Sequence, residues 1–131
     1  MTHRNFLQIF FILLSAFSLI KLYDHAINLE TFQYGEWLIN YQHGFVRRGL
    51  IGELIYLLSS IFNDNIQLAF FVLTSIFCLV YYFLNYNLLK KVKFNFIYYF
   101  IIFSPLFYIF FVVISKVGVR KEIILFIFYL F

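Results

Sequence analysis

The sequence predicts an all-α, membrane-embedded protein with several spans, and three observations lead to this fold class. Of the 131 residues, 64% are hydrophobic and 12% are charged, whereas roughly a quarter of a typical soluble domain is charged. Mean hydropathy is +0.91. The apolar residues also gather in long runs between short polar segments, so lipid must be the solvent for much of this surface. Residues 1–131 are interpreted as a single transmembrane domain.

The first apolar run, residues 6–23, predicts a transmembrane helix. It holds about 18 residues, enough for about 27 Å of helix. A signal peptide also has a basic start and an apolar centre. We prefer an uncleaved helix, because the run continues through Leu22 and Tyr23 and no A-x-A-like cleavage site precedes Tyr23.

Residues 30–42 predict an amphipathic helix that lies on the membrane interface. Leu38 and Tyr41 recur at helical spacing with Tyr34, and polar side chains lie between them. Trp37, the single tryptophan, is expected at head-group depth, where indole rings are enriched.

The next two runs predict a short helix followed by a full span. Residues 49–62 are too few to cross comfortably and include Glu53, so a re-entrant or steeply tilted helix is expected. Asn63-Asp64-Asn65 then forms a turn whose side chains can cap the next helix. Residues 66–89 predict a full span that ends in an aromatic belt of tyrosines beside a lysine cluster.

Two further runs complete the predicted set of three spans and a truncated fourth. Residues 94–115 predict the third span, kinked near Pro105. A fourth begins at residue 122, and the sequence reaches Phe131 after about half a membrane span. A helix that ended inside the bilayer would leave carbonyl groups unsatisfied. The chain is therefore expected to be the N-terminal part of a larger protein.

The predicted location is the inner (plasma) membrane, in a multi-pass arrangement with a cytoplasmic N-terminus. The tight cluster Lys90, Lys91 and Lys93 lies between two strong spans and favours this orientation. The charge count opposes it, because this cluster and Arg4 give four cytoplasmic cations against six outside. Those six are Lys21, Arg47, Arg48, Lys116, Arg120 and Lys121. A complete crossing by residues 49–62 would reverse every later loop.

Cations beside the predicted outer surface form the candidate phosphate-binding site. They are Arg47, Arg48, Arg120 and Lys121. A guanidinium group binds two phosphate oxygens at once, which suits an anionic head group. Glu53 is expected within ion-pair reach of Arg120 or Lys121, and this pairing would join two basic loops into a pocket below Trp37. The competing interpretation is ordinary contact between these cations and lipid phosphates.

Asp24 is the candidate catalytic residue, because a carboxylate at the membrane surface could act as general base toward a sugar hydroxyl. A helix-end charge in water is the alternative. His3, His25 and His43 lack metal-ligand spacing, so no metal or other cofactor is predicted. The basic residues are scattered between membrane segments, which argues against nucleic-acid binding and leaves membrane lipid as the expected partner.

Two segments, WLINYQHGFVRRGLIGEL and SPLFYIFFVVISKVGVRKE, resemble bacterial polytopic membrane proteins of surface-polysaccharide assembly. These are O-antigen or exopolysaccharide polymerase-like proteins and multi-span glycosyltransferases that use lipid-linked sugars. The resemblance implies a polyprenyl-phosphate-linked sugar as substrate, with Asp24 as the acidic residue after the first span. It also implies that Arg47, Arg48 and Arg120 bind the phosphate. The alternatives are a non-enzymatic small membrane protein that binds lipid or a membrane partner, and a non-functional truncated remnant.

Overall fold

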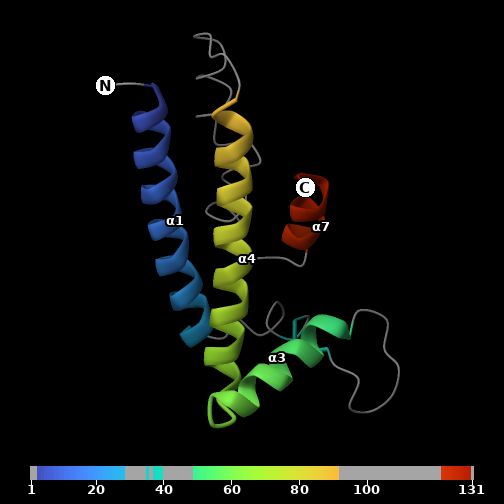
Figure 1. The fold of residues 1–131 in the computed structure, drawn as a ribbon. Helices are drawn as coiled ribbons and strands as arrows, with labels where there is room; N and C mark the ends of the chain where they lie inside the picture. Colours follow the sequence, from blue (N-terminus) through green and yellow to red (C-terminus); the bar gives the residue numbers. More distant parts are fainter. Residues whose placement is uncertain (1–2, 29–34, 36, 40–48, 92–121, 131) are drawn as a thin grey trace.

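The computed structural model describes residues 3–28, 35, 37–39, 49–91 and 122–130. Four helices occur in this part of the chain, and it contains no strand. They are α1 (His3–Asn28), α3 (Leu50–Ile61), α4 (Ile66–Leu89) and α7 (Glu122–Leu130), and Figure 1 shows their arrangement. The predicted all-α class is therefore confirmed for the described residues.

Helix α4 is the centre of the fold, since α1, α3 and α7 all pack against it. It begins and ends at the predicted residues. The side chain of Asn65 accepts a hydrogen bond from the Leu68 N–H at 3.1 Å, which satisfies one of the free donors of the first turn. Before it, Asn63 and Asp64 have φ angles of 54° and 62°, a region that these two residue types tolerate. The predicted turn and cap are confirmed.

Helices α1 and α4 lie side by side and run in opposite directions (Figure 1). Aromatic contacts fix their register: the ring centroid of Phe11 lies 6.2 Å from that of Tyr82 and 6.1 Å from that of Tyr86. Toward the other end, Tyr23 lies 5.6 Å from Phe71. The start of α1 is therefore beside the end of α4.

Helix α1 continues beyond residue 23, where the first span was expected to end. Leu22 and Ala26 lie one helical turn apart and both are buried. Because packing on this face continues past Tyr23, the helix also continues, to Asn28. Asp24 consequently lies within the helix and not in a loop after it, which corrects the prediction.

Helix α3 lies obliquely across the end of α4 at which α1 finishes (Figure 1). Its 12 residues make a helix of about 18 Å, shorter than a hydrocarbon core of about 30 Å. Its buried face carries Gly52, Ile55 and Ser59. The predicted short helix is confirmed, and its depth in the membrane stays a prediction.

Helix α7 begins at residue 122, as predicted, and packs on α4 through Ile123 and through Phe126, whose ring lies 6.4 Å from that of Tyr81. The predicted third span, residues 94–115, and most of the predicted interfacial helix, residues 30–42, lie outside the described residues. Within those residues, two helices are long and apolar enough to cross a membrane. The predicted three spans and truncated fourth are thus found in part.

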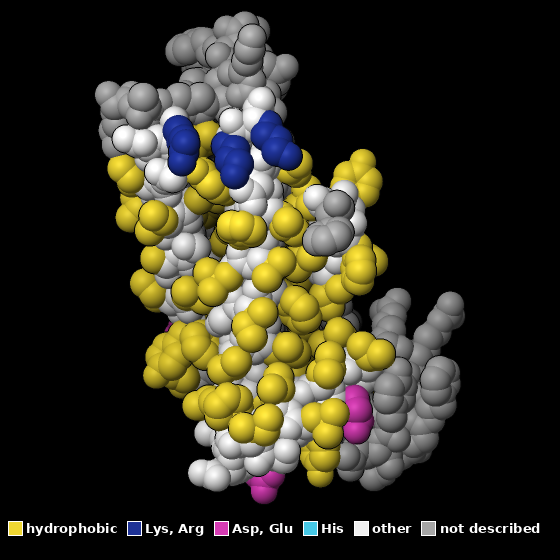
Figure 2. Space-filling view, viewed as in Figure 1, with side chains coloured by type: hydrophobic (Ala, Val, Ile, Leu, Met, Phe, Trp, Pro, Cys, Tyr) yellow, Lys and Arg dark blue, Asp and Glu magenta, His cyan; other side chains and the backbone are white. Residues whose placement is uncertain are grey.

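The surface of the helices is largely apolar (Figure 2). Large side chains of α1 and α4 point outward, for example Ile12 at 64% and Phe83 at 63% exposure. Soluble monomers rarely expose continuous apolar surface of this kind, whereas lipid accepts it. On the face shown in Figure 2, lysine and arginine side chains gather at one end of the molecule and acidic side chains toward the other.

Candidate functional site

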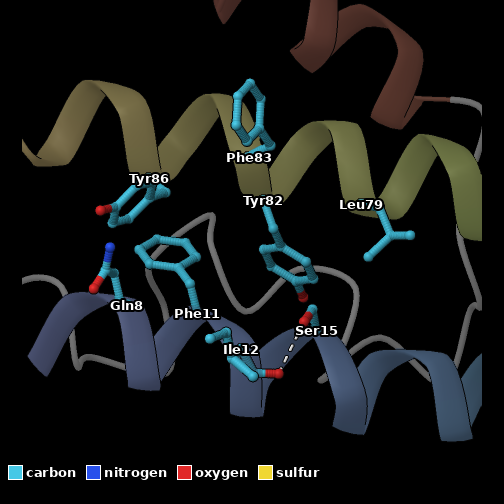
Figure 3. A pocket seen from close by; sticks show the side chains of 8 residues that line it. All are labelled: Gln8, Phe11, Ile12, Ser15, Leu79, Tyr82, Phe83 and Tyr86. Carbon is cyan, nitrogen blue, oxygen red and sulfur yellow. Dashed lines mark hydrogen bonds between the residues drawn. The ribbon is translucent and has the colours of Figure 1, made fainter. Parts of the chain in front are cut away.

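A groove of about 500 Å³ lies between α1 and α4 (Figure 3). Helix α1 contributes Gln8, Phe11, Ile12 and Ser15. Helix α4 contributes Leu79, Tyr82, Phe83 and Tyr86. The first and last contributors on each helix are seven positions apart, so the groove extends about 10 Å along the helix pair.

The groove exists because one face of α1 alternates large and small side chains. Phe11, Ser15 and Ser18 follow one another at helical spacing on the side that meets α4. Phe11 fills the space between the helices with its edge-on contacts to Tyr82 and Tyr86. Ser15 is small and leaves space beside it.

Three hydroxyl groups at the groove or beside it, those of Ser15, Ser18 and Tyr82, are bonded within the protein. Ser15 Oγ donates to the Ile12 carbonyl at 2.8 Å. Ser18 Oγ donates to the Leu14 carbonyl at 2.9 Å, so its single proton is used and the Tyr82 hydroxyl must donate to it, at 2.7 Å. These bonds remove the cost of placing hydroxyls among apolar groups, and the groove therefore presents a mainly hydrocarbon surface.

One end of the groove is polar and leads to positive charge. Gln8 and Tyr86 approach each other there from the two helices (Figure 3). Lys90 Nζ lies 5.6 Å from the centroid of the Tyr86 ring and donates to Asn87 Oδ1 at 2.6 Å. Arg4 is exposed and precedes Gln8 by one helical turn. This end of the groove is therefore basic.

The residues predicted as a site are only partly described. Asp24 is exposed near the end of α1, and Glu53 is half-buried in the first turn of α3, with its N–H bonded to the Gly49 carbonyl at 2.9 Å. The four predicted phosphate-binding cations, Arg47, Arg48, Arg120 and Lys121, lie outside the described residues. The phosphate site and the pairing of Glu53 with Arg120 or Lys121 stay predictions.

Trp37 is buried in the fold, and its predicted place at head-group depth stays a prediction. It is 2% exposed and packs on α4, with its ring 5.9 Å from that of Phe70 and 6.3 Å from that of Phe77. Contact among three aromatic rings buries a large apolar area, and the contact with Phe70 gains from edge-on geometry. Trp37 thus anchors its segment to α4.

The groove itself was missed by sequence reasoning. The sequence predicts that Tyr81, Tyr82 and Tyr86 form an aromatic belt, yet Tyr81 and Tyr82 are buried between helices. A usable signal was present: tyrosines at i and i+4 in one span and small or polar residues at positions 8, 15 and 18 in another. That pattern is typical of facing polar stripes on packed membrane helices.

No group of three or more histidine, cysteine, aspartate or glutamate side chains within the described ranges could hold a metal ion. Cys78 is buried on the contact face of α4, as a small helix-facing residue. The chemistry at the groove is therefore that of aromatic rings, aliphatic side chains and satisfied hydroxyls, with cations at one end.

The fold and the apolar surface together define an all-helical membrane protein. Comparison with protein families identifies which one: the family described as "Uncharacterised membrane protein Rv1490" matches residues 6–94, and the chain belongs to this family. The match contains α3, α4, nearly all of α1 and therefore the whole groove. Comparisons with curated proteins and with solved structures give no match.

Proposed function

We propose that this protein binds membrane lipid, holding one hydrocarbon chain in the groove between α1 and α4. The observation that carries the proposal is the groove's size and lining. Its volume of about 500 Å³ falls within the range of roughly 300–1,000 Å³ that small-molecule sites occupy. This interpretation takes up the non-enzymatic alternative that the sequence left open.

A lipid chain suits the groove better than a polar molecule does. The hydroxyls of Ser15, Ser18 and Tyr82 are already bonded within the protein. A polar ligand would therefore lose its hydrogen bonds to water and gain few from these groups. The groove also follows the two candidate spans, α1 and α4, along their length. A lipid chain lies in the same direction as such helices and reaches the groove from the side.

Photolabelling tests the proposal on the full chain. The protein is placed in phosphatidylcholine vesicles that contain a phospholipid with a photoreactive group on its acyl chain, and labelled residues are mapped by mass spectrometry. We expect Ile12 and Phe83, which line the groove, to be labelled several-fold more than Leu13 and Ile20, which are equally exposed on α1 but lie outside it.

A groove-filling variant provides the matched comparison. Ser15→Phe places a ring in the groove, whereas Ala16→Phe adds the same ring at the next, exposed position, outside the groove lining. Labelling of Phe83 should fall with the first variant and stay unchanged with the second. Leu79→Trp fills the groove from α4 and guards against a local folding defect in α1. Even labelling of all exposed positions, unaffected by filling the groove, would contradict the proposal.

The glycan-assembly function implied by the sequence resemblance is a second proposal. One observation favours it: Asp24, near the end of α1, and Glu53, in α3, lie toward the same end of the molecule (Figure 1). If Asp24 is a general base, Asp24→Asn should abolish formation of the surface polymer in the native host while protein abundance is unchanged. Normal amounts of polymer in cells that carry this variant would show that Asp24 is not the general base.

A further inference from the structure

We infer that the lipid in the groove is an anionic phospholipid whose phosphate lies between Arg4 of α1 and Lys90, the residue that follows α4. The inference rests on the proposed lipid binding and adds the head group, the side chains that recognise it and the leaflet from which it comes. It depends on three features: the position of the cations, the position of the acidic residues and the length of the groove.

The two cations lie at corresponding positions beyond the groove. Arg4 precedes Gln8 by four residues and Lys90 follows Tyr86 by four, so each lies about 6 Å beyond the polar end along its helix. Because α1 and α4 are antiparallel, both cations are at the same end of the pair, and Figure 2 shows lysine and arginine side chains grouped there. Both are exposed and accessible to a head group.

Both side chains have donors suited to phosphate. The Lys90 ammonium group has three N–H donors, and its bond to Asn87 uses one of them. The Arg4 guanidinium group presents a planar fork that binds two phosphate oxygens. Lys91, also exposed, adds a third positive charge beside Lys90.

Acidic side chains lie away from this end. Those whose side chains are described are Asp24, Glu53 and Asp64. They belong to the last part of α1, to α3 and to the turn before α4, which lie toward the opposite end of the molecule. Along the described helices, the potential at the groove's polar end is therefore positive, which complements an anionic head group.

The length of the groove favours a phospholipid over a longer isoprenoid phosphate. The groove covers about 10 Å and the cations lie about 6 Å beyond it, a total close to half of a hydrocarbon core of about 30 Å. One acyl chain of a single leaflet matches this depth. The leaflet is the one beside Arg4 and Lys90, and the cytoplasmic leaflet, rich in anionic lipids, attracts such cations.

The test compares two photoreactive phospholipids that differ only in head group, phosphatidylglycerol and phosphatidylcholine, on the full chain in mixed vesicles. We expect the anionic probe to label Ile12 and Phe83 in strong preference to the neutral probe. Arg4→Gln and Lys90→Gln should each reduce this preference about fivefold, the share of one cation near an anionic surface. Labelling by the neutral probe should fall less, because its choline group already balances the phosphate charge and the groove remains intact.

Lys21→Gln is the matched control, because it removes a cation from the same helix α1 at a distance from the groove's polar end. It should leave the preference unchanged. Equal labelling by both probes in the unmodified protein would overturn the head-group inference while the proposed lipid binding stands. An equal loss with Lys21→Gln, or stronger displacement by a polyprenyl phosphate than by unlabelled phosphatidylglycerol, would also overturn it. Absence of groove labelling by either probe would instead contradict the proposed function.

Discussion

At the scale of single residues, one hydrogen bond joins the two longest helices. The Tyr82 hydroxyl donates to Ser18 Oγ at 2.7 Å in a fully buried position. Hydrogen bonds between membrane helices stabilise by about 0.6 kcal/mol on average and at most about 1.7 kcal/mol. Tyr82→Phe should lower the free energy of unfolding in detergent by about this amount. Ser18→Ala in the Tyr82→Phe background should cost less than Ser18→Ala alone, and strictly additive losses would show that the bond contributes nothing.

Trp37 allows a second residue-scale prediction, because the sequence has a single tryptophan and its fluorescence has one source. A ring that is 2% exposed between Phe70 and Phe77 should resist quenching by aqueous iodide. Phe70→Ala should increase quenching, since it removes one wall of the site. Strong quenching in the unmodified protein would place Trp37 at the membrane surface, as the sequence alone suggested.

At the scale of elements, the docking of α3 depends on one glycine. A Cβ atom at Gly52 would overlap the carbonyl group of Ile39 and lie 2.9 Å from the carbonyl carbon of Leu38. Since backbone atoms cannot turn aside as a side chain does, Gly52→Ala should destabilise the protein by about 1–3 kcal/mol, the usual cost of overpacking. Gly35→Ala is the control, because nothing lies within 4 Å of its Cβ position. Thermal unfolding should separate the two variants, and equal melting temperatures would contradict the close contact.

Helix boundaries could be predicted from the sequence where local signals determine them. The start of α4 follows from Asn65, whose side chain caps the first turn, and its end from the lysines that follow Leu89. The end of α1 could not be predicted in this way. It depends on Leu22 and Ala26 packing inside the fold, which is a tertiary effect that hydropathy does not report.

Contacts between distant segments could not be predicted from the sequence for the same physical reason. Trp37 and Tyr82 have the composition of interface anchors, but each is buried because a facing helix or ring completes its environment. The groove depends on the register of α1 against α4, which places Ser15 near Tyr82. Neither Ser15 nor Tyr82 by itself indicates that register. The matching polar stripes on the two spans, taken together, do indicate it.

At the scale of the whole molecule, the separation of charge predicts the orientation. Arg4, Lys90 and Lys91 lie at one end of the helix pair and should face the cytoplasm, with Asp24 toward the outside. Single cysteines at positions 91 and 24, in a Cys78→Ala background, test this with a membrane-impermeant thiol reagent. Position 91 should react only in inside-out vesicles and position 24 only in right-side-out vesicles. The reverse pattern would show that the protein has the opposite orientation, with its basic end in the outer leaflet.

The antiparallel register of α1 and α4 is the basis of both the groove and the basic end. Cross-linking with a short bifunctional thiol reagent, in native membranes and in the Cys78→Ala background, measures it directly. Cysteines at positions 8 and 86, which face each other in Figure 3, should cross-link efficiently, whereas cysteines at positions 8 and 71 should not. Efficient cross-linking of positions 8 and 71, with none between 8 and 86, would show that the helices are parallel or shifted in register, and would contradict the antiparallel arrangement.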